Sequence, residues 1–311
     1  MSAEISQSLL QTAWKVPLEE EMRRFPELKQ EDIDTVLEWC RQQPHLPQVS
    51  AHTAALFLLL SNFNIELAQT YIENHYTFRT YYRNIFADRD PLSKGIKDAM
   101  TLANLTLLEG LCHSQCRVML ANLKIFESSK FNPKEFSKLS YMILEKDVLD
   151  NGFTKEGYKL LMDATGFGLG HMTAITPSFL KQVFSYFLDG ANVSIVEINI
   201  INVNVFVEKL VFLIKALTPP IVYERIKLYT KDKNALCLQK FPLSILPPEY
   251  GGQGKPVSEL SSQTEEAVRQ FRPWYLADEK YLRVDESKRP LNKQNKKVIK
   301  IQENLKSLEL D

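Results

Sequence analysis

The sequence contains few of the residues that form covalent cross-links or catalytic centres. Its 311 residues include four cysteines and five histidines. The cysteines are too few and too scattered for the disulfide framework that stabilises small secreted domains; they are Cys40, Cys112, Cys116 and Cys237. We therefore expect reduced thiols and a cytoplasmic location.

Motifs for catalysis are missing as well. The chain has no G-x-S-x-G elbow and no H-E-x-x-H pair. Asp163, His171 and Ser178 could be imagined as a triad, but nothing in their spacing points to one. The run GFGLG at 166–170 lacks the G-x-G-x-x-G spacing of a dinucleotide site, and the next helix starts only at Pro177, too far on to hold a phosphate. We expect no enzymatic activity and no cofactor.

A metal site is not supported either. Cys112, His113 and Cys116 could form half of one, but a second pair of ligands at suitable spacing is missing. We interpret this segment as two thiols that flank a turn.

The chain also lacks an excess of charge, since lysine plus arginine and aspartate plus glutamate both number 38. This balance gives no general case for nucleic acid as a partner, because nucleic-acid binding rests on a basic surface. The N-terminus lacks the pattern of a signal peptide, and no apolar run reaches the roughly 20 residues that span a bilayer. The basic segment 285–300 could bind anionic lipid or nucleic acid, but we interpret it as part of a solvated tail. We expect a monomer that meets membranes transiently.

What the chain does contain is enough apolar material for a large core, with 44% hydrophobic residues. Their spacing divides the chain into three parts. Residues 1–92 have apolar positions three and four apart, which predicts a helical domain. Residues 93–260 alternate between strand and helix patterns, whereas residues 261–311 are polar and predict a tail at the surface.

The second part predicts an α/β fold with a mixed sheet that is parallel at least in part. Its order of strand, helix, strand, helix and strand favours right-handed crossovers. The strand at 193–201 is apolar on both faces, which is typical of a central strand. Strands are predicted at 102–111, 117–126, 158–166, 193–201 and 225–230, and helices start at Asn132–Pro133 and at Thr176–Pro177.

The most hydrophobic segment is 202–220, which ends in a double proline that terminates a helix. At about 100° per residue it carries two apolar stripes, where a surface helix has one. The first stripe is Val203, Val207, Val211 and Ile214, and the second is Phe206, Leu210 and Leu213. Two interpretations are open: a helix buried between two layers, or a lid with one stripe on an apolar cavity and the other on protein or lipid.

Several motifs resemble the CRAL-TRIO lipid-binding family. The family's closing EYGG motif is similar to PPEYGGQGKPVSEL at 247–260. Its strand, turn and I-T-P helix start resemble GYKLLMDATGFGLGHMTAITPSFLKQV at 157–183, and its strand leading into a mobile gate helix resembles EINIIN followed by NVFVEKL. The family's N-terminal helical domain is similar to QQPHLP and YTFRTYY. The segments DEKYLRVDESKRP and LKSLELD resemble insect relatives of alpha-tocopherol transfer protein.

The resemblance implies a hydrophobic cage that carries one tocopherol-, retinoid- or phospholipid-like molecule. Its floor is a mixed sheet, its walls are helices, and its door is a gate helix at 203–217. The first stripe of this helix is then expected to line the cavity, and the second to contact the membrane. Strand and helix phase, together with the matched motifs, predict that the ligand is also lined by Tyr158, Met162, Phe167, Leu169, Ile175, Val183, Tyr186, Phe187, Val193, Ile195 and Ile198. Tyr186 is the expected polar anchor, because a buried phenol needs a partner.

The chain departs from relatives that bind phosphoinositides through arginines in an R-F-L-R-A-R block and a basic pair before the gate. It has Ser61 at the last of those arginines, and Ser194 and Val196 at the basic pair. Arg225 remains as a weak phosphate contact, since a single arginine is a poor clamp for several phosphates. We expect transfer to respond little to phosphoinositides.

A second function stays open: a CRAL-TRIO fold kept as a non-transporting module that docks to membranes or proteins. Tyr158, Met162 and Phe167 are bulky and could partly plug the cavity. Whether the cavity is open or filled distinguishes the two functions.

Overall fold

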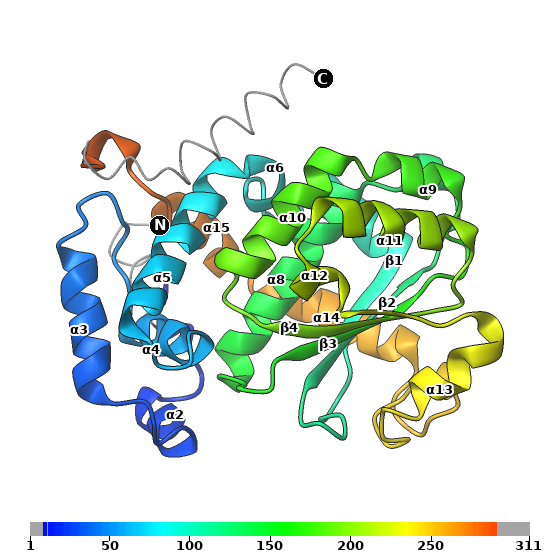
Figure 1. The fold of residues 1–311 in the computed structure, drawn as a ribbon, viewed down its shortest axis with the longest axis horizontal. Helices are drawn as coiled ribbons and strands as arrows, with labels where there is room; N and C mark the ends of the chain where they lie inside the picture. The colour runs from blue at the N-terminus through cyan, green and yellow to red at the C-terminus, as the bar shows by residue number, and fades with distance from the viewer. Residues whose placement is uncertain (1–8, 11, 291–311) are drawn as a thin grey trace.

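The computed structural model describes residues 9–10 and 12–290, and its first part is a group of helices at one end of the molecule (Figure 1). Side-chain caps define two of their starts, because Ser50 accepts a hydrogen bond from the backbone N–H of Thr53, and Asn64 from that of Leu67. The helical N-terminal part is therefore confirmed for the described residues. These helices are α2 (Leu18–Arg24), α3 (Gln30–Arg41), α4 (Ala51–Leu60), α5 (Ile65–Tyr81) and α6 (Arg83–Phe86).

A five-stranded mixed sheet forms the centre of the second part and confirms the predicted α/β class. Its strands lie side by side in chain order; β1 is antiparallel to β2, and β2 to β5 are parallel. The strands are β1 (Ala103–Leu107), β2 (Arg117–Leu123), β3 (Tyr158–Asp163), β4 (Ile195–Ile201) and β5 (Ile226–Leu228). The expectation that β4 is apolar on both faces is wrong, because Glu197 and Asn199 lie on one of them and bond to Lys240.

Helices connect the parallel strands across one face of the sheet, which we call the front face. Because each connection advances by one strand in the same direction, right-handed crossovers place all of these helices on the same side. Figure 1 shows α10 and α11 above this face. The connecting helices are α8 (Pro133–Asn151), α9 (Leu169–Ala174), α10 (Pro177–Asp189), α11 (Val205–Leu217) and α12 (Pro220–Tyr223), and α7 (Lys94–Leu102) precedes β1.

The starts of α8 and α10 follow their sequence signals. Asn132 and Thr176 accept hydrogen bonds from backbone N–H groups of the first turn, and each is followed by proline. The six-residue helix α9 was not predicted, because its glycine-rich sequence carries no apolar stripe.

The back face of the sheet is covered by the segment that follows β5. Cys237 of α13 (Asn234–Leu238), Phe241 and Leu246 pack there with Val257 and Leu260 of α14 (Val257–Gln270). The sheet residues they cover are Val118, Leu120, Leu161 and Ile201.

The EYGG segment fixes this cover to the sheet. The hydroxyl of Tyr250 accepts a hydrogen bond from Asn122 at 3.0 Å and donates one to Asp163 at 3.3 Å. Gly252 lies so close to Leu246 that a Cβ would stand 2.0 Å from its carbonyl oxygen. The second glycine of the motif is therefore required by space.

The prediction of a surface tail from residue 261 is wrong for the described residues. α14 and α15 (Arg272–Tyr281) belong to the core, with Trp274 and Tyr275 buried and the Tyr275 hydroxyl donating to Met142 O at 2.8 Å. The tail prediction rested on average polarity, which hides one buried stripe on an otherwise charged helix. Residues 291–311, including part of the predicted basic tail, lie outside the described residues.

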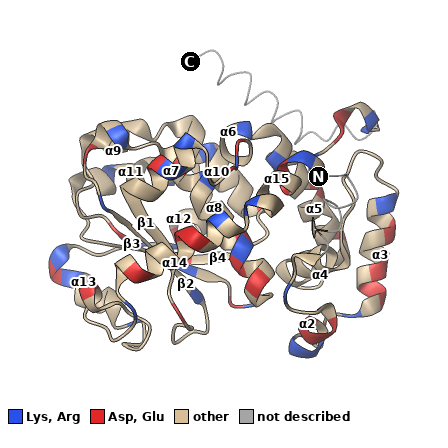
Figure 2. Ribbon diagram, turned by 180° about the vertical axis from the view of Figure 1, so that it is seen from behind, with Lys and Arg blue, Asp and Glu red and all other residues tan. Residues whose placement is uncertain are grey.

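Among the described residues there are also four short 3-10 turns: η1 (Ser128–Lys130), η2 (Lys231–Lys233), η3 (Pro248–Tyr250) and η4 (Glu286–Lys288). Positive and negative side chains are interspersed over the helices (Figure 2). Within the part of the chain that the structure describes, no helix combines the length and apolarity needed to cross a membrane.

Candidate functional site

The apolar side chains of the front face are not fully enclosed by the helices above them. Leu160 and Met162 of β3, and Ile198 and Ile200 of β4, are each half-buried, although they share clusters with residues of α10 and α11. On the back face of the same strand, Leu161 is 0% exposed. These side chains therefore keep some accessible apolar surface beneath α10 and α11, and we call the region between this surface and the two helices the apolar space.

The start of α11 is fixed at the edge of this space by Asn204. Its side-chain oxygen accepts hydrogen bonds from the backbone N–H groups of Phe206 and Val207 at 3.0 and 3.3 Å, and its amide donates to Phe167 O at 2.8 Å. The cap thus ties the helix to the loop after β3. Phe167 packs there with Ala164, Ile200, Val203, Val207 and Val211.

One side of the second half of α11 packs against α10 and α12. Ile214 is buried, and Leu210 and Leu213 are half-buried beside it. The expected exposure of Leu210 and Leu213 is therefore wrong, because side chains of neighbouring helices pack against them, whereas Phe206 is half-buried and its membrane contact stays a prediction. The residues that Leu210 and Leu213 meet are Leu180, Phe184 and Val222.

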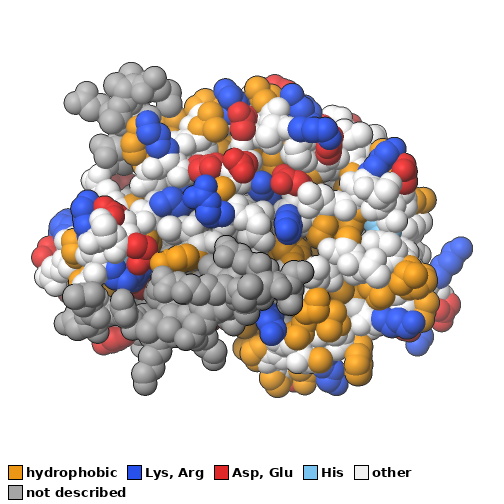
Figure 3. Space-filling view, turned by 90° about the horizontal axis from the view of Figure 1, so that it is seen from above, with side chains coloured by type: hydrophobic (Ala, Val, Ile, Leu, Met, Phe, Trp, Pro, Cys, Tyr) orange, Lys and Arg blue, Asp and Glu red, His pale blue; other side chains and the backbone are white. Residues whose placement is uncertain are grey.

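A different apolar surface on and around α11 is exposed, and we call it the α11 patch. Phe212 is 76% exposed and Val205 52%, while Leu169 of α9 and Ile221 of α12 are 55% and 54% exposed. Both neighbouring helices pack against α11, and Figure 3 shows hydrophobic side chains gathered on this side of the molecule. The prediction that Leu169 lines the cavity is wrong, because α9 turns it outward. Exposed apolar groups of this kind usually mark a contact site.

The remaining predicted lining residues divide into three groups. Met162, Phe167, Phe187, Ile198 and Val211 are half-buried around the apolar space. Val193 and Ile195 are buried in the main core at the start of β4. Ile175, Val183 and Tyr186 belong to an aromatic cluster on the side of α10 that faces α5 and α6.

The two tyrosines of the prediction have partners within the protein. Tyr186 lies 3.3 Å from His75 Nδ1, and burial raises its pKa to about 12. Tyr158 donates to Asp147 at 2.6 Å and accepts from Arg117 at 3.1 Å, and burial raises its pKa well above the usual range. Tyr186 as the polar anchor of a ligand is therefore wrong, because its hydroxyl is directed at α5.

Arg225 forms a hydrogen bond with the backbone at the edge of the sheet. Its guanidinium donates to Ile195 O at 2.8 Å, across the join of β4 and β5. Ser61, at the position of a family arginine, is buried and bonds to Leu58 O and Asn64 O. A phosphate role for Arg225 stays a prediction.

Sequence reasoning missed two residues that border the apolar space, Leu160 and Ile200. The alternation of β3 places Leu160 on the same face as Tyr158 and Met162, and that of β4 places Ile200 with Ile198. The alternation of side chains along β3 and β4 was therefore sufficient to predict that both residues lie on the front face.

The cysteines show no metal-binding arrangement. All four thiols are free, and Cys112 and Cys116 face each other across a turn in which Cys112 N donates to Cys116 O at 3.0 Å. Within the described residues, no group of three or more histidine, cysteine or acidic side chains is placed to hold a metal ion.

Comparison with known proteins gives matches over both parts of the chain. A family model described as CRAL/TRIO domain matches residues 105–252, and one described as Pinta-like, UBA domain matches residues 25–96. Clavesin-1 from Mus musculus is 22% identical over 234 residues, which are 75% of this chain and 66% of that protein, just under two thirds of its length. Clavesin-2 from Homo sapiens is 21% identical over 238 residues, which are 76% of this chain and 72% of that protein.

Among solved structures, a crystal structure of Sfh5 matches with a TM-score of 0.49 at 13% identity. The match covers 78% of this chain and 97% of that chain. The resemblance to relatives of alpha-tocopherol transfer protein is not singled out by these matches and stays a prediction.

Proposed function

We propose that the protein holds a hydrophobic small molecule or lipid between its front face and helices α10 and α11 and transfers it between membranes, because residues 105–252 match the family model described as CRAL/TRIO domain. Lipid binding and transfer, not catalysis, is the general activity of this family. A tocopherol-, retinoid- or phospholipid-like molecule has the apolar surface that such a space accepts.

The observation that carries the proposal is the incomplete burial of Leu160, Met162, Ile198 and Ile200 under a layer of helices. Apolar groups in a finished core are close-packed, so accessible apolar surface inside the molecule leaves room for an apolar guest. Burying a lipophile there contributes about 25 cal/mol per Å² of apolar surface removed from water, which needs no catalytic group.

Helix α11 is the proposed gate. Its first stripe meets the apolar space through Val207 and Val211, while Phe212 and Val205 face outward. Movement of α11 away from the sheet would open the space at the side where the α11 patch meets a bilayer. Reversible docking through a few apolar side chains suits a carrier that must leave the membrane again.

The first test is native mass spectrometry of the purified protein, with extraction and identification of the molecule that co-purifies. Filling the space with Ile198→Trp or Met162→Trp should then weaken binding of the identified lipophile by about tenfold or more, because an indole occupies the volume of the guest. Leu236→Trp is the control, since Leu236 lies 53% exposed on α13. If Ile198→Trp and Met162→Trp both bind the lipophile as tightly as the parent does, the front face is not the binding site.

The alternative is a docking module whose apolar space stays empty or closed. Val203 and Val207 are buried in one cluster with Ala164, so this part of the region beneath α11 is already packed. Vesicle binding without any co-purifying or exchangeable lipophile would favour this second function.

A further inference from the structure

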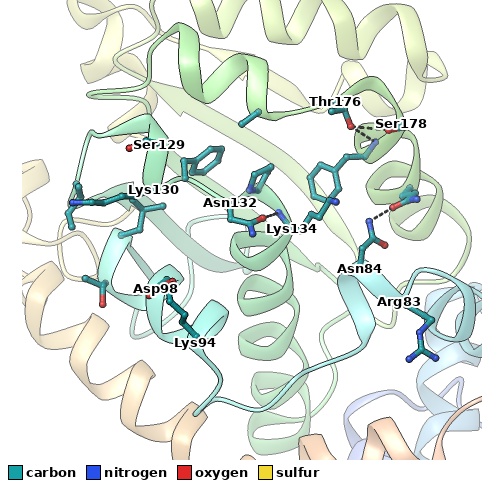
Figure 4. Close-up of a pocket in the computed structure, with 18 of the residues that line it drawn as sticks. Arg83, Asn84, Lys94, Asp98, Ser129, Lys130, Asn132, Lys134, Thr176 and Ser178 are labelled. Atoms are coloured by element: carbon teal, nitrogen blue, oxygen red, sulfur yellow. Dashed lines mark hydrogen bonds and ion pairs between the residues drawn. The ribbon is translucent and has the colours of Figure 1, made fainter. Parts of the chain in front are cut away.

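An open pocket of about 1320 Å³ lies where α6, α7, η1 and the starts of α8 and α10 meet (Figure 4). Its hydroxyl groups pair with each other, since Thr176 Oγ1 and Ser178 Oγ lie 2.9 Å apart. Figure 4 shows Arg83 extending away from Lys134. Among the described residues that line it, the pocket therefore offers no common contact point for a charged ligand.

A pair of cysteines at another place in the fold is more closely organised, beneath the turn that joins β1 to β2. Cys112 N donates a hydrogen bond to Cys116 O at 3.0 Å, and Gln115 N donates one to Cys112 O at 2.8 Å. Gln115 has a φ of 59°, in the left-handed region, which closes a three-residue turn between the two cysteines. Figure 1 shows this hairpin projecting past the end of the sheet. The backbone thus places the two cysteines opposite each other.

Both thiols contact the same hydroxyl group. Ser114 Oγ lies 3.2 Å from Cys112 Sγ and 3.5 Å from Cys116 Sγ. Residues that face each other in a hydrogen-bonded antiparallel pair have Cα atoms about 5.5 Å apart. This separation is inside the range of about 4.4–6.8 Å that disulfides require. The pair can therefore form an S–S bond without a large movement of the backbone.

The two sulfur atoms differ in their surroundings. Burial raises the pKa of the Cys112 thiol, but hydrogen bonds from the Ser114 hydroxyl and from the backbone N–H groups of Cys116 and Ser114 outweigh it and lower that pKa. Burial raises the pKa of the Cys116 thiol, which donates a hydrogen bond to Glu156 O at 3.2 Å. Cys112 is therefore suited to react as a thiolate, with a protonated thiol beside it.

The other two cysteines provide an internal comparison. Burial raises the pKa of Cys40 to about 12 and that of Cys237 to about 11. Thiols of this kind stay protonated at neutral pH and react slowly with oxidants, because the thiolate is the nucleophile. Reactivity should therefore be confined to the hairpin.

We propose that Cys112 and Cys116 form a redox-active dithiol that a hydroperoxide converts into a disulfide, with Cys112 as the nucleophile and Cys116 as the resolving thiol. In the first step the Cys112 sulfur attacks the terminal peroxide oxygen, so that an S–O bond forms and the O–O bond breaks. The alkoxide that leaves takes a proton from water and becomes an alcohol, and Cys112 becomes a sulfenic acid.

The second step closes the disulfide. The Cys116 sulfur attacks the sulfur of the sulfenic acid, the S–S bond forms, and the S–O bond breaks. The hydroxide that leaves takes the proton of the Cys116 thiol and becomes water. Two thiols and one hydroperoxide thus give one disulfide, one alcohol and one water, and two electrons pass from the thiols to the peroxide.

Oxidation changes a contact between the hairpin and the loop before β3. The Cys116 thiol holds this loop through Glu156 O, next to Gly157, whose carbonyl oxygen accepts a hydrogen bond from Arg117 N at 3.1 Å. A disulfide has no S–H group to donate. Formation of the disulfide therefore releases Glu156 from the hairpin.

The test treats the reduced full chain with tert-butyl hydroperoxide and counts thiols after denaturation. The parent should lose two of its four thiols, and peptide mapping should find a 112–116 disulfide that dithiothreitol reduces. Cys116→Ser should stop at a sulfenic acid on Cys112, which dimedone traps, and Cys112→Ser should lose thiols about tenfold more slowly or worse. Cys40→Ala and Cys237→Ala are the controls, and each should form the disulfide at the rate of the parent.

Ser114→Ala tests the shared hydroxyl at an exposed position of the turn. Without this hydrogen bond the pKa of Cys112 rises, so the increase of the oxidation rate with pH should move to higher pH and the rate at pH 7 should fall several-fold. His113→Ala, also exposed on the turn, is the matched control and should keep the pH profile of the parent. The proposal is overturned if the parent keeps all four thiols, if the loss falls on Cys40 or Cys237, or if Ser114→Ala leaves the rate and its pH profile unchanged.

Discussion

Arg79, Arg89, Glu145 and Asp278 form a buried cluster of two cations and two carboxylates between the helical part, α8 and α15. Arg79 and Arg89 lie 2.6 and 2.8 Å from Asp278, and both also pair with Glu145. Burial alone raises the pKa of Asp278, but the positive charges of Arg79, Arg283 and Arg89 outweigh it and lower that pKa. Removing any one of these four charges therefore leaves its partners buried without an opposite charge.

Asp278→Asn should lower the free energy of unfolding at pH 7 by about 3–5 kcal/mol, because it leaves buried guanidinium charge uncompensated. The measurement is urea unfolding, with Asp232→Asn at an exposed site as the control. The lowered pKa stabilises the fold above the unfolded-state value of about 4, and this contribution is lost as pH falls below it. The difference between parent and variant should therefore narrow below about pH 4; a constant difference would contradict this account.

His75 should make stability depend on pH in a higher range. Its Nδ1 lies 2.7 Å from Gly190 O, and burial followed by the charge of Arg79 lowers its pKa to about 3. The unfolded chain binds a proton at this residue below about pH 6.5 and the folded chain does not, so stability should fall as pH drops from 6.5 towards 3. His75→Gln should flatten this slope, which has a limit of about 1.4 kcal/mol per pH unit. Unfolding at several pH values measures it, and an equal slope in both proteins would show that His75 does not titrate as stated.

Residue positions inside single strands were predictable, whereas partners across the fold were not. The phase of β3 and β4 placed Met162 and Ile198 on one face from the sequence alone. The partner of Tyr186 is His75 on α5, far away in sequence, and no periodicity of α10 reveals it.

At the scale of elements, α11 presents two surfaces that should respond differently to the same change. Phe212→Asp should weaken vesicle co-sedimentation by roughly tenfold or more and leave stability nearly unchanged, because burying such a side chain is worth about 1.5–3 kcal/mol and Phe212 is 76% exposed in water. Leu210→Asp should instead lower the free energy of unfolding by several kcal/mol, about 2–5, since Leu210 packs against α10 and α12.

The control for this pair is Leu243→Asp, at a residue that is 57% exposed and lies outside the α11 patch. It should change neither vesicle binding nor stability appreciably. If Phe212→Asp sediments with vesicles as well as the parent does, the α11 patch is not the membrane contact, and the proposed gate must meet its acceptor elsewhere.

Elements with local start signals were predictable, and elements defined by packing were not. Asn132 with Pro133 and Thr176 with Pro177 marked the starts of α8 and α10 because capping is a local interaction. Helix α15 has charged residues on most of its surface and buries Trp274, Tyr275 and Asp278, so its average composition predicted a tail. Its place in the core depends on ion pairs with Arg79 and Arg89, which are far from α15 in the sequence. The pattern of residues within the helix cannot reveal these partners.

At the scale of the whole molecule, α15 joins the helical part to the sheet part. Ending the chain after Gln270 should therefore abolish cooperative unfolding. The shortened chain lacks the core residues Trp274 and Tyr275. It also lacks Asp278, the ion-pair partner of Arg79 and Arg89. Circular dichroism during thermal unfolding measures this loss. Leu276→Ala, at a 37% exposed position of the same helix, is the control and should cost less than about 0.5–1 kcal/mol. A cooperative transition in the shortened chain would show that the two parts are held together without α15.

The cover of the back face has a consequence for synthesis on the ribosome. The strands and the helices that connect them precede residue 229, but the residues that shield the back face are translated later; they are Phe241, Leu246, Val257 and Leu260. A growing chain that has completed its sheet still exposes one apolar side of it to water, and exposed apolar sheet surface promotes aggregation. We therefore expect that shielding by a chaperone, or rapid translation of residues 241–260, protects the nascent chain until these residues cover the sheet.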